Sequence, residues 1–208
     1  MLKDKDIREP LFEYFEERYP KVRIIEEKTM GRSRADIMMV LPDCLIGVEI
    51  KSDADTYARL ERQTKDYDLF FDANIIVVGS KHAKHVQEHI PEWWGIISVE
   101  EQDDKVDFYV VRQMKKNPKV EMKQKIILLW RRELSHIQEL NGMPAYKNKS
   151  KNFVREKVID TISEGVLQEQ LCQELFERDY TTIEAEIAQY RMEHNRPKRR
   201  KRKKRRTR

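Results

Sequence analysis

Hydrophobic positions along the first 115 residues switch repeatedly between the period of a helix and that of a strand. In residues 4–19, Ile7, Leu11 and Phe15 recur at helical spacing, which predicts a surface helix. Residues 73–80, ANIIVVGS, form a continuous apolar run typical of a strand buried on both faces. The full pattern predicts, in chain order, helix 4–19, strand 21–29, two strands within 31–53, helix 53–70, strand 73–80, helix 81–90 and strands 95–101 and 105–114. This alternation indicates an α/β domain.

Beyond residue 120 the apolar positions keep only the helical period. The polar, proline-containing segment KKNPK at 115–119 is predicted to be a linker. After it, helices are predicted at 126–140, 152–165, 167–178 and 181–192. The expected organisation is an α/β domain at 1–115, a small all-helical domain at 120–195 and a tail at 196–208.

The tail, RPKRRKRKKRRTR, concentrates the positive charge. It holds eleven Lys or Arg and no acid, whereas the first 195 residues hold 31 basic and 37 acidic side chains, a net charge of about −6. Such a block of like charges is predicted to be a disordered interaction arm. Its charge density favours contact with DNA through Lys198, Arg199, Arg200, Lys201, Arg202, Lys203, Lys204, Arg205 and Arg206. A solubilising tail and a nuclear-import signal are alternatives that the tail alone leaves open.

Composition narrows the class of protein further. Charged residues make up 38% of the chain, and no apolar run approaches the roughly 20 residues of a membrane span. The N-terminus lacks the pattern of a signal peptide, and Cys44 and Cys172 form no CxxC pair. We therefore expect a cytoplasmic, nucleoid-associated protein with buried thiols, no zinc site and no membrane partner.

Residues 31–53, GRSRADIMMVLPDCLIGVEIKSD, place charges inside two apolar runs. The turn dipeptide Pro42–Asp43 between them predicts a hairpin in which the numbers of opposed residues sum to 85. Asp36 then lies across from Glu49, and Arg34 lies across from Lys51. Because side chains alternate between faces, one face is entirely apolar and the polar side chains gather at the end of the other.

Two opposed carboxylates are the chemical centre of this hairpin. Their Cβ atoms would lie about 5 Å apart, where like charges are destabilising, so Asp36 and Glu49 invite either a shared proton or a bound cation. Mg²⁺ prefers such oxygen ligands, and Lys51 on the same face could activate a water or stabilise charge on phosphorus. On spacing alone, an edge hairpin with surface ion pairs is the alternative.

The tripeptide Glu-x-Lys is not specific by itself, since Glu121-Met122-Lys123 also matches it. Glu49-Ile50-Lys51 differs because it ends an apolar strand and has Asp36 opposite. The context of the tripeptide therefore carries the signal.

The order helix, strand, strand with Asp36, turn, strand with Glu49-x-Lys51 and helix resembles the PD-(D/E)XK nuclease superfamily, although Ala35 replaces its usual proline. The segments RADI, GVEIKSDADTYARLERQTKDY, VVGSKH and IPEWWGI are similar to a family of uncharacterised bacterial and phage proteins of this fold. The resemblance covers residues 6–100, and more faintly the helical region. It implies a restriction-endonuclease-like αβββαβ core with a mixed sheet flanked by helices.

This resemblance also implies an activity, which is Mg²⁺-dependent (or Mn²⁺-dependent) hydrolysis of DNA phosphodiester bonds. Asp36 and Glu49 would bind the metal, with the carbonyl of Ile50 as a third ligand. Lys51 would be the catalytic lysine. The superfamily often adds a glutamate from the first helix, and here Glu9, Glu13, Glu16, Glu26 and Glu27 all remain open.

Some branches of the superfamily carry a helical Q-x-x-x-Y motif, which Gln63 and Tyr67 match. Residues four apart share a helix face, and Arg59 lies one turn earlier. We expect Gln63 to assist catalysis, and Arg34, Arg59 and Tyr67 to contact nucleic acid. A plain surface helix is the alternative.

The sequence therefore predicts a metal-dependent deoxyribonuclease of DNA repair, recombination or mobile-element biology. One alternative is a catalytically silent nucleic-acid-binding module of the same fold. Another is a protein that recruits a partner, or forms a homodimer, through a helical seam around Leu128, Leu129 and Trp130.

Overall fold

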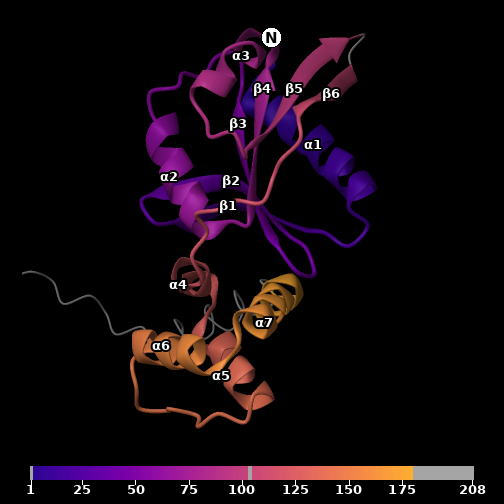
Figure 1. Ribbon diagram of the computed structural model, residues 1–208. Helices are drawn as coiled ribbons and strands as arrows, with labels where there is room; N and C mark the ends of the chain where they lie inside the picture. The colour runs from indigo at the N-terminus through magenta and orange to yellow at the C-terminus, as the bar shows by residue number, and fades with distance from the viewer. Residues whose placement is uncertain (1, 103–104, 180–208) are drawn as a thin grey trace, which may run out of the picture. The chain divides into compact units, whose positions relative to one another are not determined.

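The computed structural model describes residues 2–102 and 105–179, and its centre is one six-stranded sheet (Figure 1). The strands lie side by side in chain order: β1 (Arg23–Met30), β2 (Ser33–Val40), β3 (Leu45–Lys51), β4 (Ala73–Gly79), β5 (Gly95–Gln102) and β6 (Lys105–Arg112). Pairing is antiparallel from β1 to β3, parallel from β3 to β5, and antiparallel between β5 and β6. The predicted mixed sheet is confirmed.

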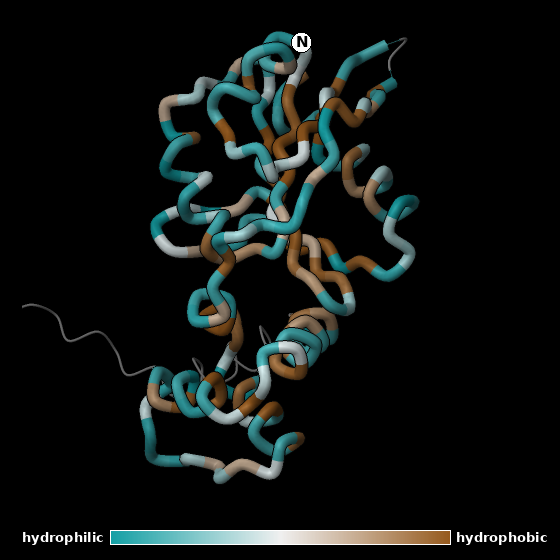
Figure 2. The backbone as a smooth tube through the Cα atoms, viewed as in Figure 1, coloured by the Kyte–Doolittle hydropathy of each residue, from teal (hydrophilic) through white to brown (hydrophobic). Residues whose placement is uncertain are grey.

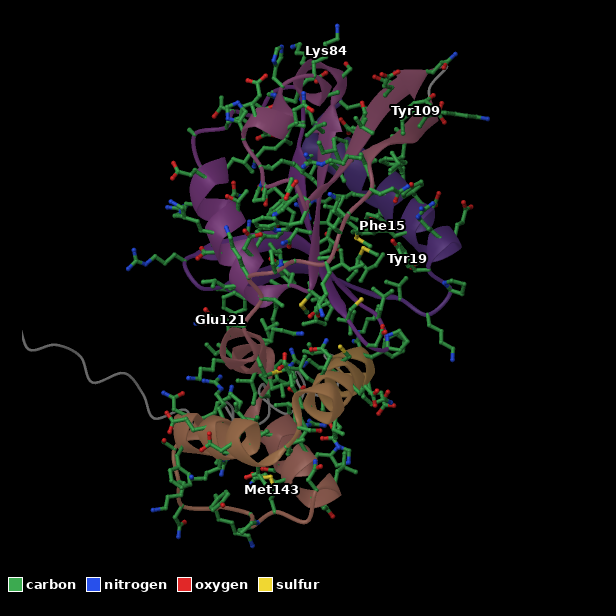
Figure 3. All side chains as sticks on the ribbon, in the orientation of Figure 1. Phe15, Tyr19, Lys84, Tyr109, Glu121 and Met143 are labelled. Carbon is green, nitrogen blue, oxygen red and sulfur yellow. The ribbon has the colours of Figure 1, made fainter. Side chains whose placement is uncertain are left out.

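Helices cover both faces of this sheet. On one face, α1 (Asp4–Arg18) buries Ile7, Leu11 and Phe15 against the apolar side of β2 and β3. On the other face lies α2 (Leu60–Phe70), whose Tyr67 is packed against Gly47 of β3. Two covering layers explain why every residue of β3 and β4 is buried. Figure 2 shows hydrophobic stretches along the strands and a largely hydrophilic α2, and Figure 3 labels Phe15 where α1 meets the sheet.

The hairpin register agrees with the prediction from sequence. Ile37 pairs with Val48 and Val40 with Leu45, so opposed numbers sum to 85. The ladder ends at the pair Ile37–Val48, so the predicted pairs Asp36–Glu49 and Arg34–Lys51 both lie beyond it. Neither is a pair of this ladder, because β2 parts from β3 at this end.

Two predicted helices are shorter than expected. The helix predicted at 53–70 begins only at Leu60, because the backbone N–H and hydroxyl of Ser52 both donate to Asp55 Oδ2, at 2.9 and 2.6 Å, and form a turn. The helix predicted at 81–90 is reduced to α3 (Ser80–Ala83) and a 3₁₀ turn (Val86–Glu88).

The described residues beyond β6 are helical, as predicted. They form α4 (Met122–Lys125), a 3₁₀ turn (Ile126–Leu128), α5 (Arg131–Leu140), α6 (Lys151–Thr161) and α7 (Glu164–Glu177). Leu128 is 4% exposed and Leu129 is fully buried, so this part of the proposed seam is not a free surface for a partner.

The segment predicted to be a linker is fastened to the sheet domain. Asn117 is 1% exposed, and its amide donates to the carbonyls of Asp68 and Phe71, both at 2.7 Å. Further on, the buried Lys125 bonds Asp72 at 2.7 Å. Residues 1–176 form one compact unit, so no break in the contacts falls at 115–120. The division there into separate folding units stays a prediction.

Helix 181–192 and the basic tail at 196–208, with Lys198 to Arg206, fall outside the described residues. Among the residues that are described, no helix has the length and apolar character of a membrane span.

Candidate functional site

A cleft of about 590 Å³ opens where β2 and β3 part and the start of α2 approaches them. Of the eight predicted site residues that lie in the described part of the chain, it gathers all but Tyr67. Those that line it are Arg34, Asp36, Glu49, Ile50, Lys51, Arg59 and Gln63. Residues brought together from a strand, its hairpin partner and a helix make this cleft the candidate site.

Glu49 is the centre of the cleft floor and is only 1% exposed. Its Oε1 accepts hydrogen bonds from Lys51 Nζ and from the amide of Gln63. Its Oε2 accepts from the Tyr67 hydroxyl at 2.7 Å. A carboxylate so deeply buried requires partners of this kind, and the lysine charge balances its own.

Asp36 lies in the middle of β2, next to the pair Ile37–Val48 at which the ladder with β3 ends. Its Oδ2 accepts from the backbone N–H of Ile50 at 2.9 Å, and its Oδ1 lies 3.6 Å from Arg8 Nη2 of α1. Burial, together with the charge of Glu49, raises the pKa of Asp36 from 3.8 to about 7. The two carboxylates predicted to oppose each other therefore do interact electrostatically.

Lys51 of β3 and Gln63 of α2 lie beside Glu49 and connect the two elements. Lys51 is 6% exposed, and its Nζ also donates to Gln63 Oε1 at 3.3 Å. Gln63 thus touches both members of the Glu49–Lys51 ion pair. This arrangement holds the ammonium group at the cleft floor, with few directions in which it can move.

Tyr67 lies behind the floor and not in the cleft. It is fully buried, so the expectation that it contacts nucleic acid is wrong. Its hydroxyl accepts from the N–H of Asp36 at 3.2 Å while lying 2.7 Å from Glu49 Oε2. Tyr67 therefore holds the backbone of Asp36 and the carboxylate of Glu49, and burial raises the pKa of Tyr67 well above its ordinary value.

The acidic residues considered as a further ligand are not equivalent in the structure. Among Glu9, Glu13, Glu16, Glu26 and Glu27, Glu27 is the member that lines the cleft. It is engaged by Arg34, whose Nη1 lies 3.0 Å away. Asp4 of α1 also lines the cleft but was not among the candidates, because it lies at the very start of the first helix.

The donor set fits a hard divalent cation. Asp36 and Glu49 place two interacting carboxylates at the floor of an open cleft, and Ile50 lines it beside them. No group of three or more His, Cys, Asp or Glu among the described residues is arranged to hold a metal. Mg²⁺ usually takes one or two carboxylates and completes its shell with water and substrate phosphate, so the two carboxylates suffice.

Three arginines of the cleft escaped the sequence reasoning. Arg8 of α1 bonds Asp4 at 2.7 Å and the carbonyl of Asp36 at 3.3 Å. Arg32 and Arg62 are exposed on the rim. The family resemblance points to a glutamate of the first helix and not to its arginine. Arg62 lies less than one helical turn from Arg59, which is the one signal for it in the sequence.

The comparisons with known proteins give one family and one distant structure. Pyrococcus furiosus SfsA in complex with Ca²⁺ is 15% identical, with a TM-score of 0.34, over 56% of this chain and 63% of that one. A likeness of this size carries no conclusion, and no curated protein matches the sequence. The family model described as bacteriophage P4 protein cII matches residues 2–199, nearly the whole chain. The chain therefore belongs to the bacteriophage P4 protein cII family.

Proposed function

We propose that this cleft hydrolyses DNA phosphodiester bonds with a divalent cation, in the manner of the PD-(D/E)XK nucleases that the sequence resembles. The observation that supports this best is the cleft floor itself. Asp36, Glu49, Lys51 and Gln63 converge there, and arginines surround them. Carboxylates for a cation, a lysine for a water or a developing charge, and a basic rim for phosphates are the groups that this reaction needs.

Each residue has a role in this proposal. Mg²⁺ or Mn²⁺ would supply a Lewis acid and lower the pKa of a bound water. Asp36, Glu49 and the Ile50 carbonyl would hold the cation. Lys51 would orient the attacking water or stabilise negative charge through Nζ, and Gln63 would keep that Nζ in place.

A second candidate function is a silent nucleic-acid-binding module. One observation favours it, because both oxygens of Glu49 already accept hydrogen bonds, from Lys51, Gln63 and Tyr67. A Glu49 held permanently in this network would be a structural residue and a poor metal ligand. The basic rim and the tail would then bind DNA without cutting it.

One assay separates the two candidates. The full chain is incubated with Mg²⁺ or Mn²⁺ and single-stranded, duplex, nicked and branched DNA. We expect cleavage that falls by about 100-fold or more in Glu49→Gln and Lys51→Met, since removal of one stabilising group costs this much in other enzymes. Glu169→Gln on the exposed side of α7 is the control. Binding with no cleavage of any substrate would support the silent module instead.

A further inference from the structure

Six basic side chains line the cleft, and they divide into two classes. Three of them are committed to carboxylates. Arg8 pairs with Asp4 and Glu26, Arg34 with Glu27, and Lys51 with Glu49. Each of these three cations therefore already has a protein carboxylate as a partner.

The other three are Arg32, Arg59 and Arg62, and they are exposed at the rim. Within residues 2–102 and 105–179, none of them forms an ion pair. They come from two separate elements. Arg32 lies in the β1–β2 turn, Arg59 is the N-cap residue of α2, and Arg62 lies in the first turn of that helix. Three unpaired guanidinium groups beside a cleft are an anion-binding arrangement, because each presents a planar fork that matches phosphate oxygens.

The local fold fixes where these arginines lie. Gly31 has a φ of +53°, and a Cβ there would meet Asp66 Oδ1 at 2.9 Å, so the β1–β2 turn packs directly on α2. The Ser52–Asp55 turn precedes α2, and Arg59 is the N-cap residue of this helix. The two elements that carry the arginines are therefore held against each other.

We propose that Arg32, Arg59 and Arg62 hold consecutive phosphates of a single nucleic-acid strand as it crosses the cleft. The inference rests on the proposed function for the position of the reacting phosphate, over Asp36 and Glu49. A single strand suits the site because the cleft, at about 590 Å³, has the size of a small-molecule pocket, which a duplex is too wide to enter. The arginines also offset the carboxylates of the floor, which would otherwise repel a polyanion.

The test uses the full chain and a variant, Arg32→Gln/Arg59→Gln/Arg62→Gln. The control, Arg18→Gln/Lys21→Gln/Lys84→Gln, removes the same charge from exposed sites that do not line the cleft. The probe is a labelled oligothymidylate of about twelve nucleotides, which is long enough to cross the cleft and extend beyond it. Its binding is measured by fluorescence anisotropy in EDTA over a range of salt concentrations. We expect the cleft variant to weaken binding about tenfold. The slope of log K against log salt should fall by up to about 2, because each of the lost phosphate contacts contributes roughly 0.7 on a single strand.

Several results would overturn the inference. Equal losses in the cleft variant and the control would show that only net charge matters. A duplex probe weakened as much as the single strand would refute the single-strand assignment, and thymidine monophosphate competing as well as the oligonucleotide would refute a strand of several phosphates. If no protein cleaves DNA but the two variants differ in binding, the strand site stands and the proposed hydrolysis fails. If wild type cleaves and the cleft variant binds and cleaves equally well, the proposed function stands and this inference fails.

Discussion

Asp36 links the site to the stability of the fold. Its pKa of about 7, against an ordinary 3.8, means that the folded state binds this proton more tightly than the unfolded state. Without a cation, its contribution to the free energy of unfolding is fully present below about pH 4 and is lost as the pH rises through about 7. The difference between the two pKa values corresponds to at most about 4 kcal/mol.

We therefore expect urea unfolding in EDTA to give a free energy that falls between pH 5 and pH 8. Asp36→Asn should remove most of this dependence, because the amide carries no charge at either pH. Asp160→Asn, on the exposed surface of α6, should leave it intact. Parallel pH curves for wild type and Asp36→Asn would contradict the assignment.

Arg8 and Lys51 are the positive charges that act on Asp36, and Arg8 Nη2 lies 3.6 Å from Asp36 Oδ1. Arg8→Met should therefore lower the melting temperature in EDTA, because Asp36 and Glu49 then lose a compensating charge. It should also tighten Mn²⁺ binding, by about tenfold or 1.4 kcal/mol, as read from the melting temperature at increasing Mn²⁺. Arg18→Met is the matched control in the same helix, and a variant that binds Mn²⁺ less tightly than wild type would show that Arg8 supports the cation.

Sequence reasoning reached the residues whose chemistry conflicts with their surroundings. Asp36, Glu49 and Lys51 were found because charges stand in apolar strands, and the structure brings them together. Arg8 and the positioning role of Tyr67 were not found. Both depend on contacts across separate elements, and a basic residue on a surface helix or a tyrosine on an amphipathic one carries no local sign of such a contact.

At the scale of elements, Gly47 sets the distance between β3 and α2. A Cβ at this position would lie 2.6 Å from Tyr67 Cδ1 and closer still to Phe71 Cδ2. Gly47→Ala should therefore push α2 away, cost about 1–3 kcal/mol in the free energy of unfolding, and displace the Tyr67 hydroxyl from Glu49. Urea unfolding measures the first effect and cleavage or metal binding the second.

Gly165 provides the matched control for that substitution. It lies in the first turn of α7, and a Cβ there would meet nothing within 4 Å. Gly165→Ala should be neutral or stabilise by up to about 1 kcal/mol, since alanine is the better helix former. Similar losses at both glycines would mean that close packing at Gly47 is not the cause.

The elements were predictable where their pattern was local. The hairpin register followed from one turn dipeptide and an alternating pattern, and it is confirmed from Ile37 to Val40. The start of α2 was missed because Asp55 bonds back to Ser52, which competes with helix formation and leaves no trace in hydrophobic periodicity. A buried turn of this kind is decided by side-chain hydrogen bonds and not by the apolar pattern.

For the molecule as a whole, the basic tail remains a prediction about affinity. Replacing its eleven Lys and Arg with Gln should leave the melting temperature unchanged. Binding to duplex DNA should weaken and depend less on salt. The slope of log K against log salt should fall by at most about 10, because each lost phosphate contact contributes roughly 0.9. Cleavage at low salt and saturating DNA should survive. An unchanged affinity and slope would indicate that the tail serves a partner other than nucleic acid.

The attachment of residues 115–119 to the rest of the protein could not be predicted from their composition. KKNPK has the composition of a linker, yet Asn117 within it is buried and bonds the end of α2. Composition shows how polar a segment is. Whether the segment is attached to the sheet depends on acceptors close to it in space, such as the carbonyls of Asp68 and Phe71. Only three-dimensional contacts carry that information.

The strand order has a consequence for how this chain is made. Because β1 to β6 are neighbours in the sheet in the order in which they are synthesised, each strand finds its edge already formed when it leaves the ribosome. Asp36, Glu49, Lys51, Gln63 and Tyr67 all fall within the first third of the chain. The floor of the cleft can therefore be assembled on a nascent chain, long before the helical region and the charged tail have been translated.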